Sequence, residues 1–268
     1  MTISNSALSM LPIITSRLLE TEDWLRYGFT RRVAGMGLAD GNVSYSGGRD
    51  RTDAWVMRQR WLSPLGLDPD AIATTGQVHG SSVLPVDGSD RGRGARPGSA
   101  ILGLADATMT QDPGPVLFSL HADCLPILLA DPVQRVVAVV HAGWRGTVAD
   151  IARLTVMAMT ERYGSDPADL IAFLGPAISG EHYEVGADVI EAWNQVERAS
   201  PEAFWPGRKG RWQFDAVIAN ESRLLVAGLL PASIERSGIC TWRSAGDWFS
   251  HRAQGPTTGR FGAFIAIR

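Results

Sequence analysis

Continuous apolar runs, rather than alternating ones, dominate the hydrophobic pattern of this chain. Runs of about four to eight apolar residues bounded by turn residues are typical of strands buried on both faces. The pattern predicts strands at 24–30, 72–78, 82–86, 106–110, 116–120, 126–130, 135–140, 170–174, 234–240 and 261–267. Helical spacing predicts helices at 50–65, 146–163, 186–199 and 214–228. Strands and helices are mixed rather than strictly alternating, so we expect an α/β layered fold with a mixed β-sheet and not a doubly wound Rossmann sheet.

The segments between these elements indicate loops and a single domain. The stretch 35–48 is glycine-rich and polar, and the stretch 88–99 combines Gly and Pro with three arginines that we expect to be solvated. No internal repeat, phosphate-binding Walker loop or linker is visible. We therefore expect one domain over 21–268, preceded by an N-terminal extension over 1–20.

Composition excludes several classes of partner. Hydrophobic residues make up 45% and charged residues 20% of the 268 residues, and the net charge is −3, which offers no field for nucleic acid or an anionic membrane. Two cysteines, Cys124 and Cys240, do not make a disulfide framework and fit a reducing compartment. The first fifteen residues hold an apolar patch that is too short to span a bilayer. We expect a cytoplasmic protein, monomeric or a small homo-oligomer, that acts on small molecules.

Three of the predicted strands end near histidine or cysteine, residue types that commonly serve as metal ligands. The run 135–140 leads into the hexapeptide His141-Ala-Gly-Trp-Arg-Gly, whose glycines let the chain turn sharply. The run 116–120 leads into His121-Ala-Asp-Cys124, and a third segment delivers His79 to a glycine. Two imidazoles and a thiolate are a donor set suited to zinc.

Such a set supports catalysis, although each member alone also has an ordinary structural explanation. Cys124 alone is explained as a small buried hydrophobe, and His79 and His141 as satisfied core histidines. Three together at strand ends favour a shared site. A catalytic zinc has three protein ligands, keeps its fourth position open, and lowers the pKa of bound water to about 7.

The same atoms allow two other chemistries. Cys124 could act as a nucleophile with His141 or His79 as its base. Copper also binds two histidines and a cysteine. A laccase-type multicopper centre, however, needs many more histidines than the five of this chain, and His182 and His251 lie in separate polar segments.

At these residues the chain resembles the YfiH family, whose members have long been labelled laccase-domain or polyphenol oxidase proteins. The resemblance extends from about Tyr27 to the C-terminus. It is carried by Gly76-Gln77-Val78-His79-Gly80, Ala105-Asp106-Ala107, Ala122-Asp123-Cys124-Leu125-Pro126, the hexapeptide 141–146, Gly175-Pro176-Ala177-Ile178, Tyr183-Glu184-Val185-Gly186, Cys240-Thr241, Phe249-Ser250-His251-Arg252 and Thr258-Gly259-Arg260. The implied fold is the YfiH-type single-domain α/β/α sandwich, similar to a cysteine-hydrolase fold.

The resemblance also implies an activity. It implies zinc (with copper as the other candidate metal) bound by His79, Cys124 and His141, and a purine nucleoside phosphorylase acting on adenosine, inosine, guanosine and methylthioadenosine, with adenosine deamination as a second reaction. The alternatives are a cysteine-dependent amidase in peptidoglycan editing, a non-enzymatic nucleoside-binding module, and a copper-dependent polyphenol oxidase, which the histidine count disfavours.

Substrate contacts are implied at two further positions. Asn42 and Arg58 match an asparagine and an arginine near nucleoside and phosphate, although the family pattern around both is degraded here, and His121 replaces the usual threonine or serine. An arginine fork suits phosphate, so Arg58 is the first candidate for that contact and Arg145 the second. Arg145 has an alternative role, pairing with a carboxylate to hold its turn.

We assign catalytic roles to Cys124, His141 and Arg58, and substrate binding to Asn42, Arg58, Arg145 and Glu184. Deamination by a zinc enzyme also needs a carboxylate that moves protons. Glu184 is one candidate. Asp123 is the other, but successive residues of a strand face opposite sides, so a structural role is at least as well supported for it.

Overall fold

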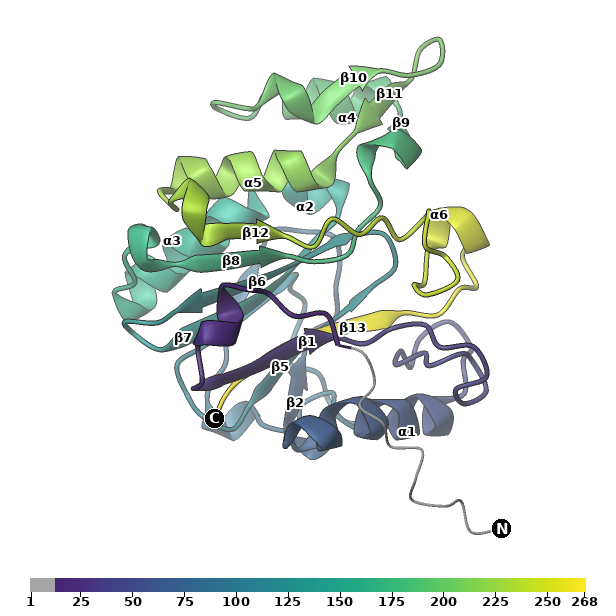
Figure 1. Ribbon diagram of the computed structural model, residues 1–268, viewed down its shortest axis with the longest axis vertical. Coiled ribbons are helices and arrows are strands. Elements are labelled where there is room, and N and C mark those ends of the chain that lie inside the picture. Colours follow the sequence, from purple (N-terminus) through teal and green to yellow (C-terminus); the bar gives the residue numbers. More distant parts are fainter. Residues whose placement is uncertain (1–12) are drawn as a thin grey trace.

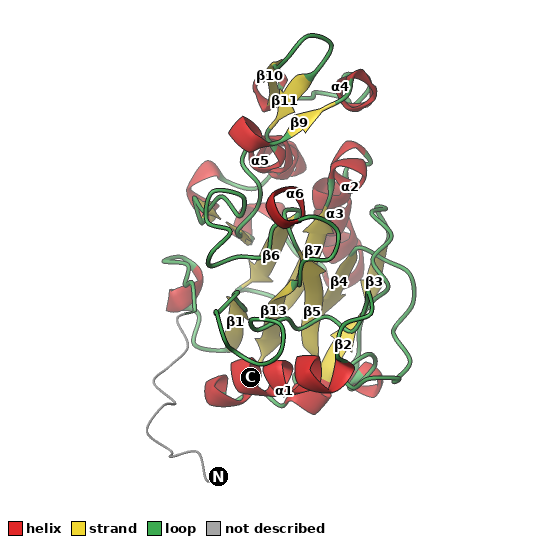
Figure 2. Cartoon of the chain, turned by 90° about the vertical axis from the view of Figure 1, so that its right-hand side faces the viewer, coloured by secondary structure: helices red, strands yellow, loops and turns green. Residues whose placement is uncertain are grey.

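Two mixed β-sheets stacked face to face form the centre of the fold (Figures 1 and 2). The computed structural model describes residues 13–268. One sheet contains, in spatial order, β1 (Leu25–Phe29), β13 (Phe261–Ile267), β5 (Val116–His121) and β2 (Ile72–Thr74). The other contains β12 (Ile234–Arg236), β8 (Ile171–Leu174), β6 (Leu125–Asp131), β7 (Val136–Ala142), β4 (Ala107–Thr110) and β3 (Val83–Pro85).

Both sheets mix parallel and antiparallel pairs. In the first sheet β2 runs parallel to β5, whereas β13 is antiparallel to β1 and β5. In the second sheet β12 pairs with β8 and β3 pairs with β4 in parallel, and the inner pairs are antiparallel. The mixed strand pairing predicted from the sequence is therefore confirmed.

The main hydrophobic core lies between the two sheets. It contains Leu117 and Ile265 from one sheet and Leu128, Val139 and Phe173 from the other, all at most 1% exposed. Every residue of β6 and of β7 is buried, which explains why these strands are continuous apolar runs in the sequence.

Helices cover the outer faces of the sheets. Helix α1 (Arg51–Leu62) packs Met57 and Trp61 against the four-stranded sheet. Helices α3 (Ile151–Tyr163) and α5 (Ala216–Ala227) cover the six-stranded sheet. The layered α/β class is confirmed, and its β layer consists of two sheets, because strands that are apolar on both faces must be covered on both.

A small third sheet lies at the far end of the molecule, at the top of Figure 1. Its antiparallel strands are β10 (Phe204–Pro206), β11 (Trp212–Phe214) and β9 (Glu184–Val185), and α4 (Ala187–Trp193) packs beside them. No apolar run marked these strands in the sequence, because each has at most three residues and is only partly buried.

Several predicted elements are shorter than expected. The helix expected at 146–163 is divided into α2 (Trp144–Val148) and α3 at Asp150, whose φ of 69° lies in the left-handed region and interrupts the helical ladder. The strand expected at 234–240 ends at Arg236, and the helix expected at 186–199 ends at Trp193. A short helix α6 (His251–Gln254) follows Ser250, whose hydroxyl accepts from the Ala253 N–H.

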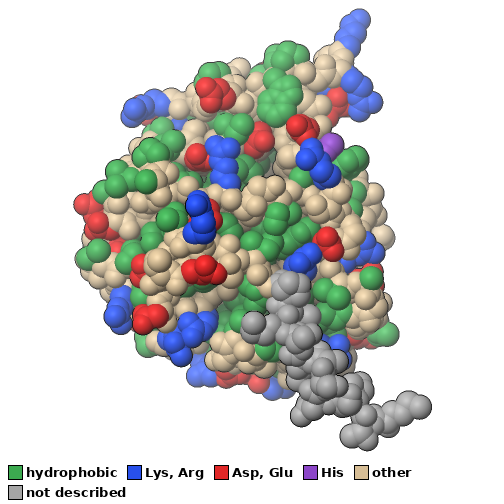
Figure 3. Space-filling model, in the orientation of Figure 1, with side chains coloured by type: hydrophobic (Ala, Val, Ile, Leu, Met, Phe, Trp, Pro, Cys, Tyr) green, Lys and Arg blue, Asp and Glu red, His purple; other side chains and the backbone are tan. Residues whose placement is uncertain are grey.

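The expected boundary between extension and domain at residue 20 stays a prediction. Residues 1–12 lie outside the described part, and beyond them Leu19 is buried in the core while the Ser16 hydroxyl donates to Glu235. Within residues 13–268, none of the helices has the length and apolar character of a bilayer span. Acidic and basic side chains are interspersed on the face shown in Figure 3.

A buried ion pair lies at the break between α2 and α3. Arg223 of α5, 2% exposed, donates to both Asp150 oxygens at 2.7 and 2.9 Å, and the more exposed Arg153 also pairs with that carboxylate. Arg223 thereby joins α5 to the α2–α3 junction.

We predict that Arg223→Met lowers the free energy of unfolding by about 3 kcal/mol, because it removes the buried partner of a carboxylate. Urea unfolding measures this change. Arg153→Met is the matched control and costs less than about 1 kcal/mol, since the side chain of Arg153 is 34% exposed and its substitution leaves the buried pair intact. Equal losses in the two variants would contradict the assignment.

Candidate metal centre

His79, Cys124 and His141 converge on one point. Their ligand atoms all lie within 4.8 Å of one another, and within residues 13–268 this is the group of His, Cys, Asp and Glu side chains arranged to hold an ion. The rings of His79 and His141 meet edge to face, with centroids 4.9 Å apart. The three residues that the sequence analysis proposed as ligands are thus brought together.

Two of these residues lie in connections that run from one sheet to the other, and the third lies near the end of a strand. His79 lies in the connection from β2 to β3, and Cys124 lies in the turn from β5 to β6, so both connections leave the four-stranded sheet and enter the six-stranded one. His141 lies in β7, one residue before its end, opposite Pro126. His79 is exposed, Cys124 is half-buried and His141 is buried. The cluster therefore has a closed side and a side open to solvent.

Asp106, at the entry to β4, organises the cluster. Its carboxylate accepts from the backbone N–H groups of Val78, His79 and Gly80 at 3.2, 3.0 and 2.7 Å. It also accepts from Nδ1 of His141 at 2.9 Å, which leaves Nε2 of His141 for a metal. Burial alone would raise the pKa of Asp106, but these hydrogen bonds outweigh it and lower the pKa.

Asp106 is not among the site residues predicted from the sequence. The available signal was the Ala105-Asp106-Ala107 motif, which places a carboxylate where an apolar strand begins. A buried carboxylate needs partners, so a charged residue at the entry to a buried strand points to a binding network.

The cysteine and histidine favour each other's charged forms. Burial would raise the pKa of the Cys124 thiol, but the charge and hydrogen bonds of His141 and His79 outweigh it and lower the pKa to about 6. Burial lowers the pKa of His141, whereas the charge of Cys124 and the hydrogen bond to Asp106 raise it above its ordinary value. The thiolate is both the metal-binding and the nucleophilic form of cysteine.

Glycines of the hexapeptide allow the close approach of these segments. A Cβ at Gly143 would lie 2.7 Å from the ring of His79 and 3.3 Å from Sγ of Cys124. A Cβ at Gly146 would lie 2.7 Å from the carbonyl oxygen of Gly80. A side chain at either position would push the His79 segment away. The donor set, the Nε2 of His141 that Asp106 leaves available for a ligand role, and the open side together fit a zinc ion.

Asp123 and His121 hold the turn that carries Cys124. The carboxylate of Asp123 accepts from the Thr241 hydroxyl at 2.6 Å and from the Arg252 N–H at 2.7 Å. Nδ1 of buried His121 donates to the Cys124 carbonyl at 3.1 Å, so its Nε2 accepts from the Ser119 hydroxyl at 2.8 Å. Burial lowers the pKa of His121 well below its usual value. The structure thus gives both side chains structural partners.

Asn42 and Arg58 lie in the interior. The side chain of Asn42 accepts from the N–H groups of Ser44 and Arg260 and donates to the Ser44 carbonyl. Arg58 of α1 is 1% exposed, and burial lowers its pKa to about 10. Its guanidinium donates to three carbonyl oxygens, those of Val43, Gly94 and Ala95. The structure does not bring Arg58 into the cluster of metal ligands.

Arg145 and Glu184 have different surroundings. The Arg145 guanidinium lies over its neighbour Trp144, 4.3 Å from the ring centroid, and in the described residues it forms no ion pair with a carboxylate.

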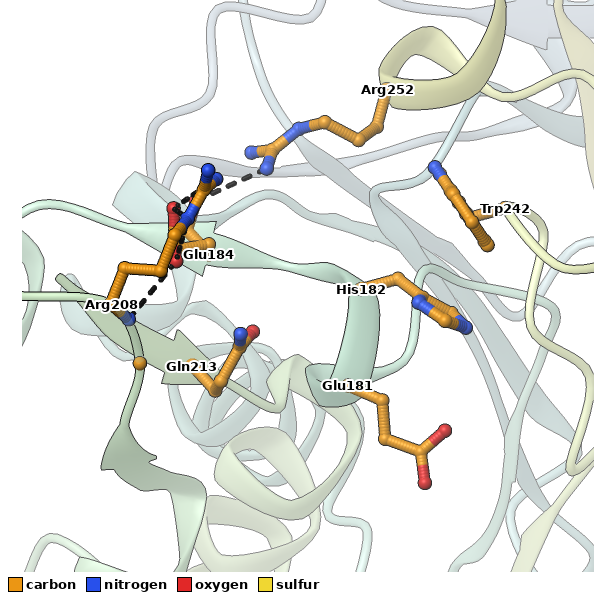
Figure 4. A pocket seen from close by; sticks show the side chains of 8 residues that line it. Glu181, His182, Glu184, Arg208, Gln213, Trp242 and Arg252 are labelled. Atoms are coloured by element: carbon orange, nitrogen blue, oxygen red, sulfur yellow. Dashed lines mark hydrogen bonds and ion pairs between the residues drawn. The ribbon is translucent and has the colours of Figure 1, made fainter.

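Glu184 on β9 forms a bidentate pair with Arg208, which lowers the pKa of Glu184. Glu184 lines a cavity of about 540 Å³ (Figure 4). The other side chains drawn there are Glu181, His182, Arg208, Gln213, Trp242 and Arg252.

Known proteins resemble this chain in sequence and in fold. Residues 26–268 match the family model described as multi-copper polyphenol oxidoreductase laccase. The chain is 31% identical to purine nucleoside phosphorylase YlmD of Bacillus subtilis, over 96% of both chains. It is 39% identical to a purine nucleoside phosphorylase of Xylella fastidiosa, over 78% of this chain and 77% of the relative.

Solved structures of two relatives have a similar fold. YlmD of Geobacillus stearothermophilus superposes with a TM-score of 0.88 at 32% identity, covering 92% of this chain and 93% of that one. The hypothetical protein YfiH of Bacillus licheniformis also has a TM-score of 0.88, at 29% identity, covering 92% of this chain and 95% of that one. The chain belongs to the YfiH/YlmD family of laccase-domain proteins, whose curated members include purine nucleoside phosphorylases.

Proposed function

We propose that this protein is a zinc-dependent purine nucleoside phosphorylase. The observation that carries the proposal is the convergence of His79, Cys124 and His141 on a point that is open on one side, in a chain whose relatives are named for this activity. Its substrates are adenosine, inosine, guanosine and methylthioadenosine, with inorganic phosphate. Phosphorolysis involves no electron transfer, so zinc suits the site better than redox-active copper.

In this reaction an oxygen of phosphate attacks C1′ of the ribose as the bond from C1′ to the purine nitrogen breaks. The electron pair of that bond goes to the purine, which takes up a proton, and ribose 1-phosphate is the second product. Bound zinc supplies a Lewis acid that orients or polarises an oxygen ligand. Asp106 keeps His141 in the tautomer and orientation that the site requires, and the hexapeptide glycines keep the His79 segment close.

Adenosine deamination is the second reaction that we propose. Water replaces the amino group at C6 of adenine, and inosine and ammonia are released. Of the nearby carboxylates, Asp106 and Asp123 are engaged by backbone and side-chain donors, and Glu184 is paired with Arg208.

A cysteine-dependent amidase is a second candidate, and one observation favours it. Cys124, His141 and Asp106 form a connected series of thiol, imidazole and carboxylate, with a Cys124 pKa lowered to about 6. This arrangement is typical of an activated nucleophile. It uses the same atoms as the metal site, so the two functions exclude each other at any one moment.

The purified protein is expected to contain about one zinc per chain, as zinc sites of this ligand type do, and to convert inosine and phosphate to hypoxanthine and ribose 1-phosphate. Cys124→Ala removes the thiolate ligand and abolishes both metal binding and phosphorolysis. Elemental analysis and a coupled assay measure the two quantities. Cys240→Ala, at the other cysteine, retains both. Full metal content and activity in Cys124→Ala would exclude the site.

Asp106→Asn is expected to weaken zinc binding by about 10–100-fold, since it removes one acceptor and places an amide N–H₂ against donor groups. Competition with a chromogenic chelator measures the affinity. Asp112→Asn, on the turn after β4, keeps the wild-type affinity. Wild-type zinc affinity in a folded Asp106→Asn protein would show that the carboxylate does not support the ligands.

Metal removal separates the two candidate functions. Chelation is expected to abolish phosphorolysis, and added zinc restores it. Zinc also protects Cys124 from iodoacetamide, because a metal-bound thiolate is not free to be alkylated. Turnover of an amide substrate by the metal-free protein, blocked by iodoacetamide, would instead establish the cysteine-dependent function.

A further inference from the structure

Two arginines from distant parts of the chain meet beside the metal centre. Arg260 directly precedes β13, whose Phe261 pairs with His121, three residues before Cys124. Arg49 directly precedes the N-cap residue of α1. Nη1 of Arg260 donates to the Thr258 carbonyl at 2.7 Å, and Nη2 of Arg49 donates to the same oxygen. Two guanidinium groups therefore share one neutral acceptor.

No carboxylate of the described residues pairs directly with either guanidinium. The acceptors of Arg49 and Arg260 are backbone carbonyls. Nε of Arg49 is buried without an acceptor. Burial and the charge of Arg49 lower the pKa of Arg260, whereas the negative charges of Cys124 and Asp123 raise it. Two adjacent cations that make no direct ion pair are complementary to a dianion.

The free donors of Arg260 suit an oxyanion. Its Nη1 is occupied by the carbonyls of Thr258 and Gly259, while Nε and Nη2 make no hydrogen bond with the described residues. The pair Nε–Nη2 is one of the planar forks with which arginine binds two oxygens of a phosphate. The backbone N–H of Arg260 donates to Asn42 at 2.9 Å, so Asn42 positions this arginine.

We propose that Arg49 and Arg260 form the binding site for inorganic phosphate, an inference that rests on the proposed phosphorolysis. Arg260 holds two phosphate oxygens and Arg49 neutralises the second charge, so a third oxygen is directed toward C1′ of the nucleoside. Electrostatic neutralisation also lowers the repulsion between the dianion and the Cys124 thiolate. This assignment replaces Arg58, whose Nε and Nη1 donate to three backbone carbonyls in the interior.

The test compares Arg49→Gln and Arg260→Gln with the wild type and with Arg243→Gln, an exposed arginine that pairs with Glu181. Binding of inorganic phosphate alone is measured by calorimetry, and KM values for phosphate and inosine are measured separately. We expect each of the two Gln variants to weaken phosphate binding and raise the phosphate KM at least about tenfold, consistent with a lost charge-assisted hydrogen bond. In Arg49→Gln and Arg260→Gln the KM for inosine stays within about twofold of the wild-type value. Arg243→Gln behaves as the wild type in all three measurements.

Arg260→Lys keeps one charge but not the fork, and we expect it to bind phosphate with an affinity between those of the wild type and Arg260→Gln. Wild-type phosphate affinity in folded Arg49→Gln and Arg260→Gln proteins would overturn the phosphate site while leaving phosphorolysis intact. Phosphate binding that depends on both arginines, without turnover of any purine nucleoside, would instead retain the site and overturn the proposed function.

Discussion

The carboxylate of Asp106 is the interaction on which the site depends. It accepts three backbone N–H groups from the segment that carries His79 and one ring N–H from His141, so a single buried charge fixes two ligands from different parts of the chain. A buried carboxylate without these donors would be strongly unfavourable, and the His79 segment without the carboxylate would have unpaired N–H groups. The hydrogen bonds of Asp106 that stabilise the folded chain are therefore the same bonds that position the metal-binding side chains.

The stacking of the two sheets determines where the candidate metal centre lies. His79 and Cys124 both lie in connections that cross from the four-stranded to the six-stranded sheet, and His141 ends the strand beside them. Burial of the apolar faces between the sheets sets the distance between these crossings. The hexapeptide glycines then allow an approach closer than a Cβ would permit. The positions of the ligands therefore follow from the hydrophobic core and not from local sequence alone.

The same geometry supports two chemistries because a thiolate beside an imidazole is both a ligand pair and a nucleophile with its base. A zinc ion would replace the proton that His141 and Cys124 otherwise share, and this competition links metal content to thiol reactivity. Arg49 and Arg260, which donate to one carbonyl oxygen and make no ion pair in the described residues, add the dianion site that we propose and that an amidase does not require. Together these features favour phosphorolysis over amide hydrolysis.

The sequence by itself determined the buried strands and identified the three candidate metal ligands, because continuous apolar runs and the residues that follow them are local properties. The tertiary structure alone decided that the β layer is double, that Asp106 joins two ligands, and that Arg58 donates to interior carbonyls. It also divided the helix expected at 146–163 at Asp150, which has a left-handed φ and pairs with Arg223 of α5. Each of these outcomes depends on contacts between residues far apart in the chain, whose partners no local pattern identifies.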